Sequence, residues 1–281
     1  MIFFLKKFYH HSQKLINLLF KINYSSITHL NNKFHFIFIF LFSFFSLIQN
    51  SEIKMIIQGK GEINILNNSF NYDPSNVIVN GQSKPEYQKN DSFENDLNNI
   101  TIKFNNKITS GEYMLEGMTN IIEIDLSNFD ASNVINMNSM FKDCINLKRI
   151  TFGDINISLV KNMNKLFFNC TNLTIIDRLD FDTISVKSMI RMFTYCKSLL
   201  SINAEFNPQN VENFLDCFAC CYKLETINLP NFRKTNATNI QGMFYQNYEL
   251  KYVDLSNFEL SPFITNIRGM FEYSSSLFLI K

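Results

Sequence analysis

An internal repeat of 26 residues constrains the fold of this chain more than any other feature of its sequence. One apolar position recurs seven times, at spacings of 26, 26, 26, 25, 26 and 27 residues. A fixed period of this length is typical of chains in which each repeat forms one unit that packs on its neighbours. The repeat therefore predicts a stacked architecture. The seven positions are Met114, Met140, Leu166, Met192, Cys217, Met243 and Met270.

Further columns keep the same phase and supply the predicted apolar core. A Phe directly follows most of the recurring positions, and in four repeats a Cys stands three residues after that Phe. In most repeats a Leu then begins an apolar L-x-x-I pattern. We expect these columns to be buried one above another. The predicted core residues are Leu147, Leu173, Leu199, Leu224, Leu250, Phe141, Phe167, Phe193, Phe244, Cys144, Cys170, Cys196 and Cys221.

Each repeat divides into a predicted strand, a turn and a predicted short helix. The segment that begins at Leu147 and ends at Phe152 has the length and the apolar spacing of a short strand. In the other half of the repeat, apolar residues follow one another at steps of three, three, one and three. This spacing places them on one face of a helix. In one repeat they are Val134, Met137, Met140, Phe141 and Cys144.

A single repeat is too small to fold by itself, because ordering its backbone costs more free energy than its few apolar contacts return. Stacking gives every strand a partner at about 4.8 Å. We therefore predict a solenoid over residues 100–281, of about seven units. Residues 51–99 are predicted to form a small β cap over the first repeat, because the segment from Ile53 to Leu66 alternates like a hairpin around Gly59 and Gly61. The sequence stops at Lys281 inside a repeat without a polar cap, which predicts either a truncated sequence or an oligomerising edge.

The N-terminal segment, residues 1–50, combines a basic stretch with an apolar run that begins at Phe34 and ends at Ile48. As a helix this run would span roughly 22 Å, which is short of the roughly 30 Å hydrocarbon core of a bilayer. We therefore expect a signal peptide, or an uncleaved signal anchor that would attach the protein to a membrane. The alternative is a buried apolar segment of a soluble domain.

A polar column accompanies the apolar ones. Its amides are expected to satisfy backbone groups that the turn of each repeat leaves unpaired. The functional alternative is a row of ligand-binding amides. The column consists of Asn136, Asn162, Ser188, Asn213, Asn239 and Asn266.

The six cysteines allow two structural interpretations. Cysteines one repeat apart would have Cα atoms about 5 Å apart, which permits disulfides such as Cys144 to Cys170 or Cys196 to Cys221. The favoured alternative is a column of free thiols packed as small apolar residues. A metal site is not expected at Cys217, because zinc requires four ligands and no His lies nearby in the sequence.

The segment from Asp125 to Leu147, D-L-S-N-F-D-A-S-N-V-x-x-M-x-x-M-F-x-x-C-x-x-L, resembles the repeats of the BspA-like leucine-rich-repeat surface proteins. The resemblance covers roughly residues 100–281 and implies an α/β leucine-rich-repeat solenoid. It also implies a secreted or surface protein of adhesion, with a host, matrix or cell-surface protein as its partner. The sequence departs from the pattern at Asn247 and Ser274, where the Cys column should continue, and at Cys217, where Met is usual.

The outward positions of the predicted strands form the candidate binding surface, because an extended surface of mixed charge suits protein recognition. The alternative is that this surface is only solvated. Weak calcium binding is a further alternative for the column Asp125, Asp177, Asn203, Asn228 and Asp254. The candidate partner-binding residues are Glu123, Asp125, Lys148, Arg149, Asp177, Glu225, Lys251, Tyr252 and Asp254.

The sequence offers little to catalysis or to nucleic-acid binding. The repeats contain no His and no nucleophile or phosphate-binding motif, so neither an enzyme nor a cofactor is expected. A net charge of +1, from 26 basic and 25 acidic residues, gives no field that would attract nucleic acid. We expect a secreted or surface-displayed binding protein. The alternatives are an intracellular scaffold for protein interactions, and an enzyme whose catalytic groups lie outside the repeats.

Overall fold

The computed structural model describes residues 51–84, 90–177, 179, 182–204, 206–229, 235–255, 258–259 and 261–280. The basic stretch and the apolar run predicted to direct export lie outside these residues. Among the residues that the structure describes, no helix is long and apolar enough to cross a membrane.

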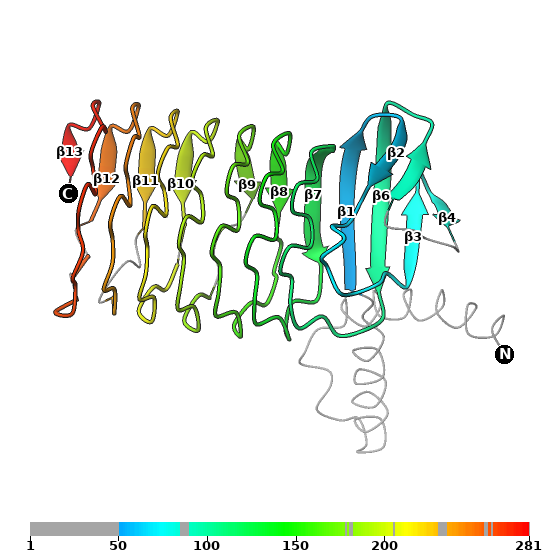
Figure 1. Cartoon of the computed structure of the whole chain (residues 1–281), viewed down its shortest axis with the longest axis horizontal. Helices are drawn as coiled ribbons and strands as arrows, with labels where there is room; N and C mark the ends of the chain where they lie inside the picture. The colour runs from blue at the N-terminus through cyan, green and yellow to red at the C-terminus, as the bar shows by residue number, and fades with distance from the viewer. Residues whose placement is uncertain are drawn as a thin grey trace, which may run out of the picture. The chain divides into compact units, whose positions relative to one another are not determined.

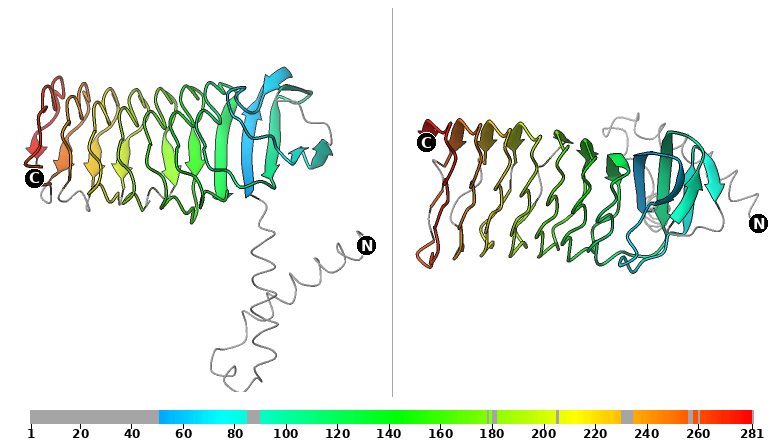
Figure 2. Two further views of the ribbon diagram at one scale, coloured as in Figure 1. Left: turned by 60° about the horizontal axis from the view of Figure 1, so that its bottom comes forward. Right: turned by 45° about the horizontal axis from the view of Figure 1, so that its top comes forward.

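The repeats form a β-solenoid whose short parallel strands line one face (Figures 1 and 2). Strand β7 pairs with β8 and β8 with β9, and further along the stack β10 pairs with β11, β11 with β12 and β12 with β13. The central apolar residues, such as Ile124, Ile150 and Ile176, are in register. The strands are β7 (Ile121–Asn128), β8 (Arg149–Thr151), β9 (Ile175–Asp177), β10 (Ser201–Asn203), β11 (Thr226–Asn228), β12 (Tyr252–Asp254) and β13 (Leu279–Ile280).

An antiparallel sheet precedes the solenoid and shields the edge of its first strand. Strand β1 pairs antiparallel with both β6 and β7, so that it joins the sheet to the repeats. The predicted hairpin around Gly59 is wrong, because β1 does not pair with β2, which pairs with β5 instead. The strands are β1 (Ser51–Gln58), β2 (Gly61–Asn64), β3 (Asn76–Val79), β4 (Gln82–Lys84), β5 (Asn90–Phe93) and β6 (Leu97–Phe104).

The short helices predicted for each repeat are wrong: within the described ranges this half of the repeat is a series of turns. Ser139 and Asp143 have φ angles of 56° and 61°, and Lys165 and Asn169 repeat this at 55° and 59°. A residue in the left-handed region ends an α-helix, since its amide leaves the helical path. The apolar spacing could not reveal this, because the same side chains face the core from either backbone.

Backbone hydrogen bonds in the turn half alternate between the same repeat and the next. The amides of Met137 and Phe141 donate to carbonyls of the following repeat at 2.9 and 3.0 Å, whereas those of Met140 and Cys144 donate within their own turn at 3.3 and 3.2 Å. Half of these amides therefore have a partner only when a neighbouring repeat is present. This is the backbone reason why one repeat cannot fold alone.

The predicted core columns lie buried one above another. The rings of Phe141, Phe167, Phe193, Phe218, Phe244 and Phe271 form a continuous stack with centroid distances of 5.5, 5.2, 5.5, 5.7 and 5.1 Å. The Leu column is equally buried, with Leu147 and Leu173 at 0% exposure and Leu199 at 2%. The shared apolar spine of the repeats is thus present.

All six cysteines are free, and four of them form a column of buried hydrogen-bond donors. The Cys170 thiol donates to the Phe141 carbonyl of the previous repeat at 3.0 Å, and the thiols of Cys144, Cys196 and Cys221 each make the equivalent bond to the repeat before their own. The column continues without sulfur, because the Asn247 amide donates to the Phe218 carbonyl at 2.9 Å and the Ser274 hydroxyl to the Phe244 carbonyl at 2.7 Å. The two departures from the repeat pattern therefore keep its hydrogen bond.

The polar column satisfies turn amides, as the sequence predicted. The Asn136 side-chain oxygen accepts a hydrogen bond from the Asn138 amide at 2.9 Å, and Asn162, Asn213, Asn239 and Asn266 do the same two residues ahead. A chain of isolated β-bridges links the members of this column from Ser110 to Asn266.

The strand side of the solenoid is interrupted between β9 and β10, which belong to different sheets (Figure 1). On the turn side, the β-bridge between Asn162 and Ser188 still connects the two repeats on either side of this interruption. Ile176 is partly exposed, whereas Ile150 and Ile227 in the same column are fully buried. In the sequence, Arg178 occupies the position of this repeat that corresponds to Leu126 and Phe152 in the two repeats before it. Arg178 itself lies outside the described residues.

Candidate recognition surface

The predicted binding residues lie on the outer side of the strands. In β8 and β11 the middle residue is buried and its neighbours face solvent. Lys148, Arg149 and Glu225 are exposed, and Asp177, Lys251, Tyr252 and Asp254 are half-buried. The alternation arises because successive side chains of a strand point to opposite faces.

Four of the eight charged residues predicted for this surface form ion pairs across adjacent repeats. Arg149 binds the Asp177 carboxylate at 2.8 Å, and the Thr151 hydroxyl donates to the same carboxylate at 3.2 Å. Lys251 binds Glu225 at 2.8 Å. The hydrogen bond with Glu225 raises the pKa of Lys251, which therefore stays charged. The surface is thus a patterned array of opposite charges without one dominant sign.

The predicted binding residues fall into two groups on either side of the strand break, and two of them lie beside strand β1. Lys148, Arg149 and Asp177 lie before the break between β9 and β10, and the residues of β11 and β12 lie after it. Glu123 and Asp125 lie on β7, which is paired with β1 at Ile56 and Lys54, so they lie beside the cap. The structure therefore does not join all nine predicted residues into one site.

The column considered for calcium is engaged in hydrogen bonds with protein groups. Asp177 accepts from Arg149, the Asn228 amide donates to Asn203 at 3.0 Å, and the Tyr252 hydroxyl donates to Asp254 at 2.9 Å. In the part of the chain with described positions, no group of three or more His, Cys, Asp or Glu side chains is arranged to hold a metal ion.

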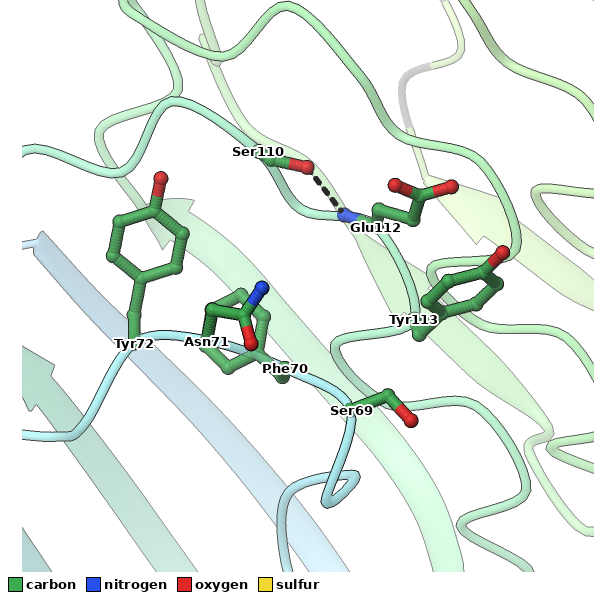
Figure 3. A pocket seen from close by; sticks show the side chains of 7 residues that line it. All are labelled: Ser69, Phe70, Asn71, Tyr72, Ser110, Glu112 and Tyr113. Carbon is green, nitrogen blue, oxygen red and sulfur yellow. Dashed lines mark hydrogen bonds between the residues drawn. The ribbon is translucent and has the colours of Figure 1, made fainter.

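A small pocket of about 130 Å³ lies where the cap meets the first turns (Figure 3). The Tyr72 hydroxyl hydrogen-bonds Thr109 at 2.7 Å, which lowers the pKa of Tyr72, and the Glu112 charge raises the pKa of Tyr113. Nothing in the sequence indicated this pocket, because its lining residues come from two segments, 69–72 and 110–113, that come together only in the folded protein. Its lining residues are Ser69, Phe70, Asn71, Tyr72, Ser110, Glu112 and Tyr113.

The buried thiols are poor nucleophiles, because burial disfavours the thiolate. Burial raises the pKa of Cys144 to about 12, and it raises the pKa values of Cys170, Cys196 and Cys221 as well. These side chains act as packed donors at neutral pH.

Comparison with known proteins identifies the repeat region. No curated protein and no solved structure with which the chain was compared matches it significantly. The model of the family described as Mycoplasma protein of unknown function, DUF285, matches residues 82–199 and again residues 175–278. Because the two matches together span well over half of the sequence, this chain belongs to the DUF285 family.

Proposed function

We propose that this protein is a secreted or surface-displayed recognition protein that binds another protein through the outer side of its strands and catalyses no reaction. The observation that carries the proposal is the array of outward polar side chains on β8, β9, β11 and β12, repeated at the spacing of the solenoid. Such an extended surface offers many weak, geometrically defined contacts to a large partner.

The charge pattern supports a protein partner over a polyanion. Arg149 and Asp177 lie side by side, as do Lys251 and Glu225, so both signs of charge alternate along the face. A partner with complementary charges would be oriented by this pattern, whereas a nucleic acid would meet repulsion at every carboxylate.

Display at the surface is supported by the resemblance of the repeats to BspA-like surface proteins and by the apolar run from Phe34 to Ile48. We propose that this run directs export, as a signal peptide or as an anchor. The second candidate is an intracellular scaffold that uses the same face.

A protease-shaving experiment on intact cells separates the two candidates. We expect an added protease to remove the repeats from intact cells while a cytosolic marker protein persists. If the repeats survive on intact cells and are cleaved only after lysis, surface display is excluded.

The binding face is tested with purified full-length protein and immobilised fibronectin or collagen, which represent matrix proteins. Reversing the charge in Lys148→Glu changes the strand face, and Lys161→Glu is the matched control because Lys161 is an exposed residue of the turn side. We expect Lys148→Glu to weaken binding about threefold to thirtyfold, at about 1 to 2 kcal/mol for a charge contact. Equal loss with both variants, or binding with neither matrix protein, would contradict the proposal.

A further inference from the structure

Tyrosines gather along one edge of the turn side in the later repeats. Five of the 11 tyrosines in the sequence lie there, from the third repeat of the ring stack onward. We call them the tyrosine edge. Tyr195, Tyr248 and Tyr273 are 36%, 40% and 57% exposed, respectively. The tyrosine edge consists of Tyr195, Tyr222, Tyr245, Tyr248 and Tyr273.

The rings of the tyrosine edge contact one another from repeat to repeat. Tyr222 and Tyr248 have centroids 5.3 Å apart, and Tyr245 and Tyr273 are 5.6 Å apart with the rings nearly perpendicular. These contacts hold the rings in fixed positions without burying them. A fixed, partly exposed ring loses little conformational entropy when a partner binds, which is why tyrosine is frequent at protein interfaces.

The repeat does not require aromatic residues at these positions. The place of Tyr195 and Tyr273 is taken by Asp143 and Asn169 in earlier repeats, where the same left-handed backbone is present. Because polar residues fold equally there, the tyrosines are not explained by packing of the core.

The edge already holds one cation. The Lys197 ammonium lies 5.7 Å from the ring centroid of Tyr195 and 5.5 Å from that of Tyr222, so it is shared between rings of two adjacent repeats. Both distances fall within the range of a cation–π contact. The geometry of neighbouring repeats at this edge is therefore suited to a primary ammonium group.

Beyond Lys197 the rings continue but the lysine does not. The position of Lys197 is taken by Tyr222 and then by Tyr248 in the next two repeats. The exposed residue Glu272 takes the place of Tyr245 in the following repeat, and its carbonyl accepts from the Gln246 amide at 2.8 Å. Burial, Tyr273 and the charge of Glu272 together raise the pKa of Tyr245. This end of the edge thus combines ring faces with a carboxylate that forms no ion pair among the described residues.

We propose that the tyrosine edge is a second interaction surface, which binds a lysine- or arginine-bearing segment of a partner protein by placing its cationic side chains against Tyr245, Tyr248 and Tyr273 beside Glu272. The partner is identified by its charge, because rings and a carboxylate attract cations and repel anions. This surface lies on the turn side, so it does not depend on the proposed role of the strand face.

The first test uses the full-length protein and a seven-residue oligolysine peptide, with an oligoglutamate peptide as the negative probe. The chain has no Trp, so its intrinsic fluorescence comes mainly from its 11 tyrosines, five of which form the tyrosine edge. Tyr248→Leu and Tyr273→Leu each keep an apolar side chain but remove the ring. We expect each to weaken oligolysine binding about twofold to fivefold, the effect of about 0.5 to 1 kcal/mol per exposed cation–π contact.

Tyr72→Leu is the control for loss of a ring, since Tyr72 lies between strands β2 and β3 of the part that precedes the repeats, where its ring packs against Phe70 at 5.3 Å, and is not part of the tyrosine edge. It should bind oligolysine as the unaltered protein does. Equal weakening by Tyr72→Leu, or binding of oligoglutamate as strong as that of oligolysine, would overturn the proposal.

The second test is a gain of binding, which a damaged fold cannot imitate. Lys197→Met removes the internal ammonium and keeps an unbranched side chain, so the pair Tyr195 and Tyr222 becomes available to the probe. We expect oligolysine affinity to rise about twofold to fivefold. Unchanged or weaker binding by Lys197→Met would show that these rings do not receive a cation from the partner.

Discussion

The buried thiols of this solenoid occupy a position at which a side-chain hydrogen-bond donor recurs from repeat to repeat. Cys144, Cys170, Cys196 and Cys221 each donate to a carbonyl of the previous turn, and Asn247 replaces them with an amide. Asn247 uses its side-chain oxygen as well, accepting from the Cys221 amide at 2.9 Å. The hydrogen bond of this column is therefore kept from repeat to repeat, whereas the donor atom changes from sulfur to nitrogen. Sequence reasoning identified the Cys residues as core but had no signal for the acceptor, which is a backbone atom of another repeat.

The donor role predicts a difference between two substitutions of similar size. Cys170→Ala removes one of the two hydrogen bonds that the Phe141 carbonyl accepts, the other coming from the Cys144 amide at 3.2 Å, and we expect a loss of about 0.5 to 1.5 kcal/mol in the free energy of unfolding. Cys170→Ser keeps a donor, as Ser274 does in the last repeat, and should retain most of the stability. Urea denaturation of both variants followed by circular dichroism measures the difference. Equal destabilisation by Ala and Ser would mean that the thiol acts by volume alone.

At the scale of the elements, the strands and turns of one repeat differ in how they depend on their neighbours. On the turn side the polar column bridges every repeat from Ser110 to Asn266. On the strand side the ladder stops after β9 and resumes at β10. The interruption coincides in sequence with Arg178, a charged residue at a position that is apolar in the other repeats. Pattern reasoning treated all strands as equivalent and therefore did not predict the break.

The break predicts local differences in amide hydrogen exchange. Ser201 and Asn203 of β10 are in register with Thr226 and Asn228 of β11, which pair with β10. The equivalent pairing of β10 with β9 is absent between these two strands as described. We expect the amides of Ser201 and Asn203 to exchange faster than those of Thr226 and Asn228, because unpaired amides are not protected. Exchange measured by NMR at single residues decides this, and equal protection at the four positions would contradict a break in solution.

At the scale of the whole molecule, the ring stack runs through the break. Phe167 and Phe193 lie on its two sides with centroids 5.2 Å apart, close to the spacing elsewhere in the stack. The core spine and the turn side are therefore continuous, although the strand side is not. Stability in such a stack is the sum of each repeat and its contacts with the next, so an unbroken spine should transmit unfolding along the molecule.

This continuity predicts that core substitutions on either side of the break act on one unfolding transition. Leu147→Ala lies before the break and Leu224→Ala after it, and both side chains are fully buried. Each should lower the stability of the same transition by about 2 to 5 kcal/mol, the usual cost of such a cavity. Scanning calorimetry measures the result. Two separate transitions, each shifted by only one of the variants, would show that the break divides the molecule into independent parts.

The sequence by itself determined the period, the identity of the core columns, the parallel stacking of strands and which strand positions face outward. These follow from side-chain pattern, because a residue that recurs every 26 positions meets the same environment in each repeat. Only the tertiary structure decided that turns with left-handed residues replace the predicted helices, that β1 pairs with β6 and β7, and that the strand ladder breaks at β9. The physical reason is that these features depend on where backbone amides find their partners. Those partners lie in other repeats, and the spacing of apolar side chains carries no information about them.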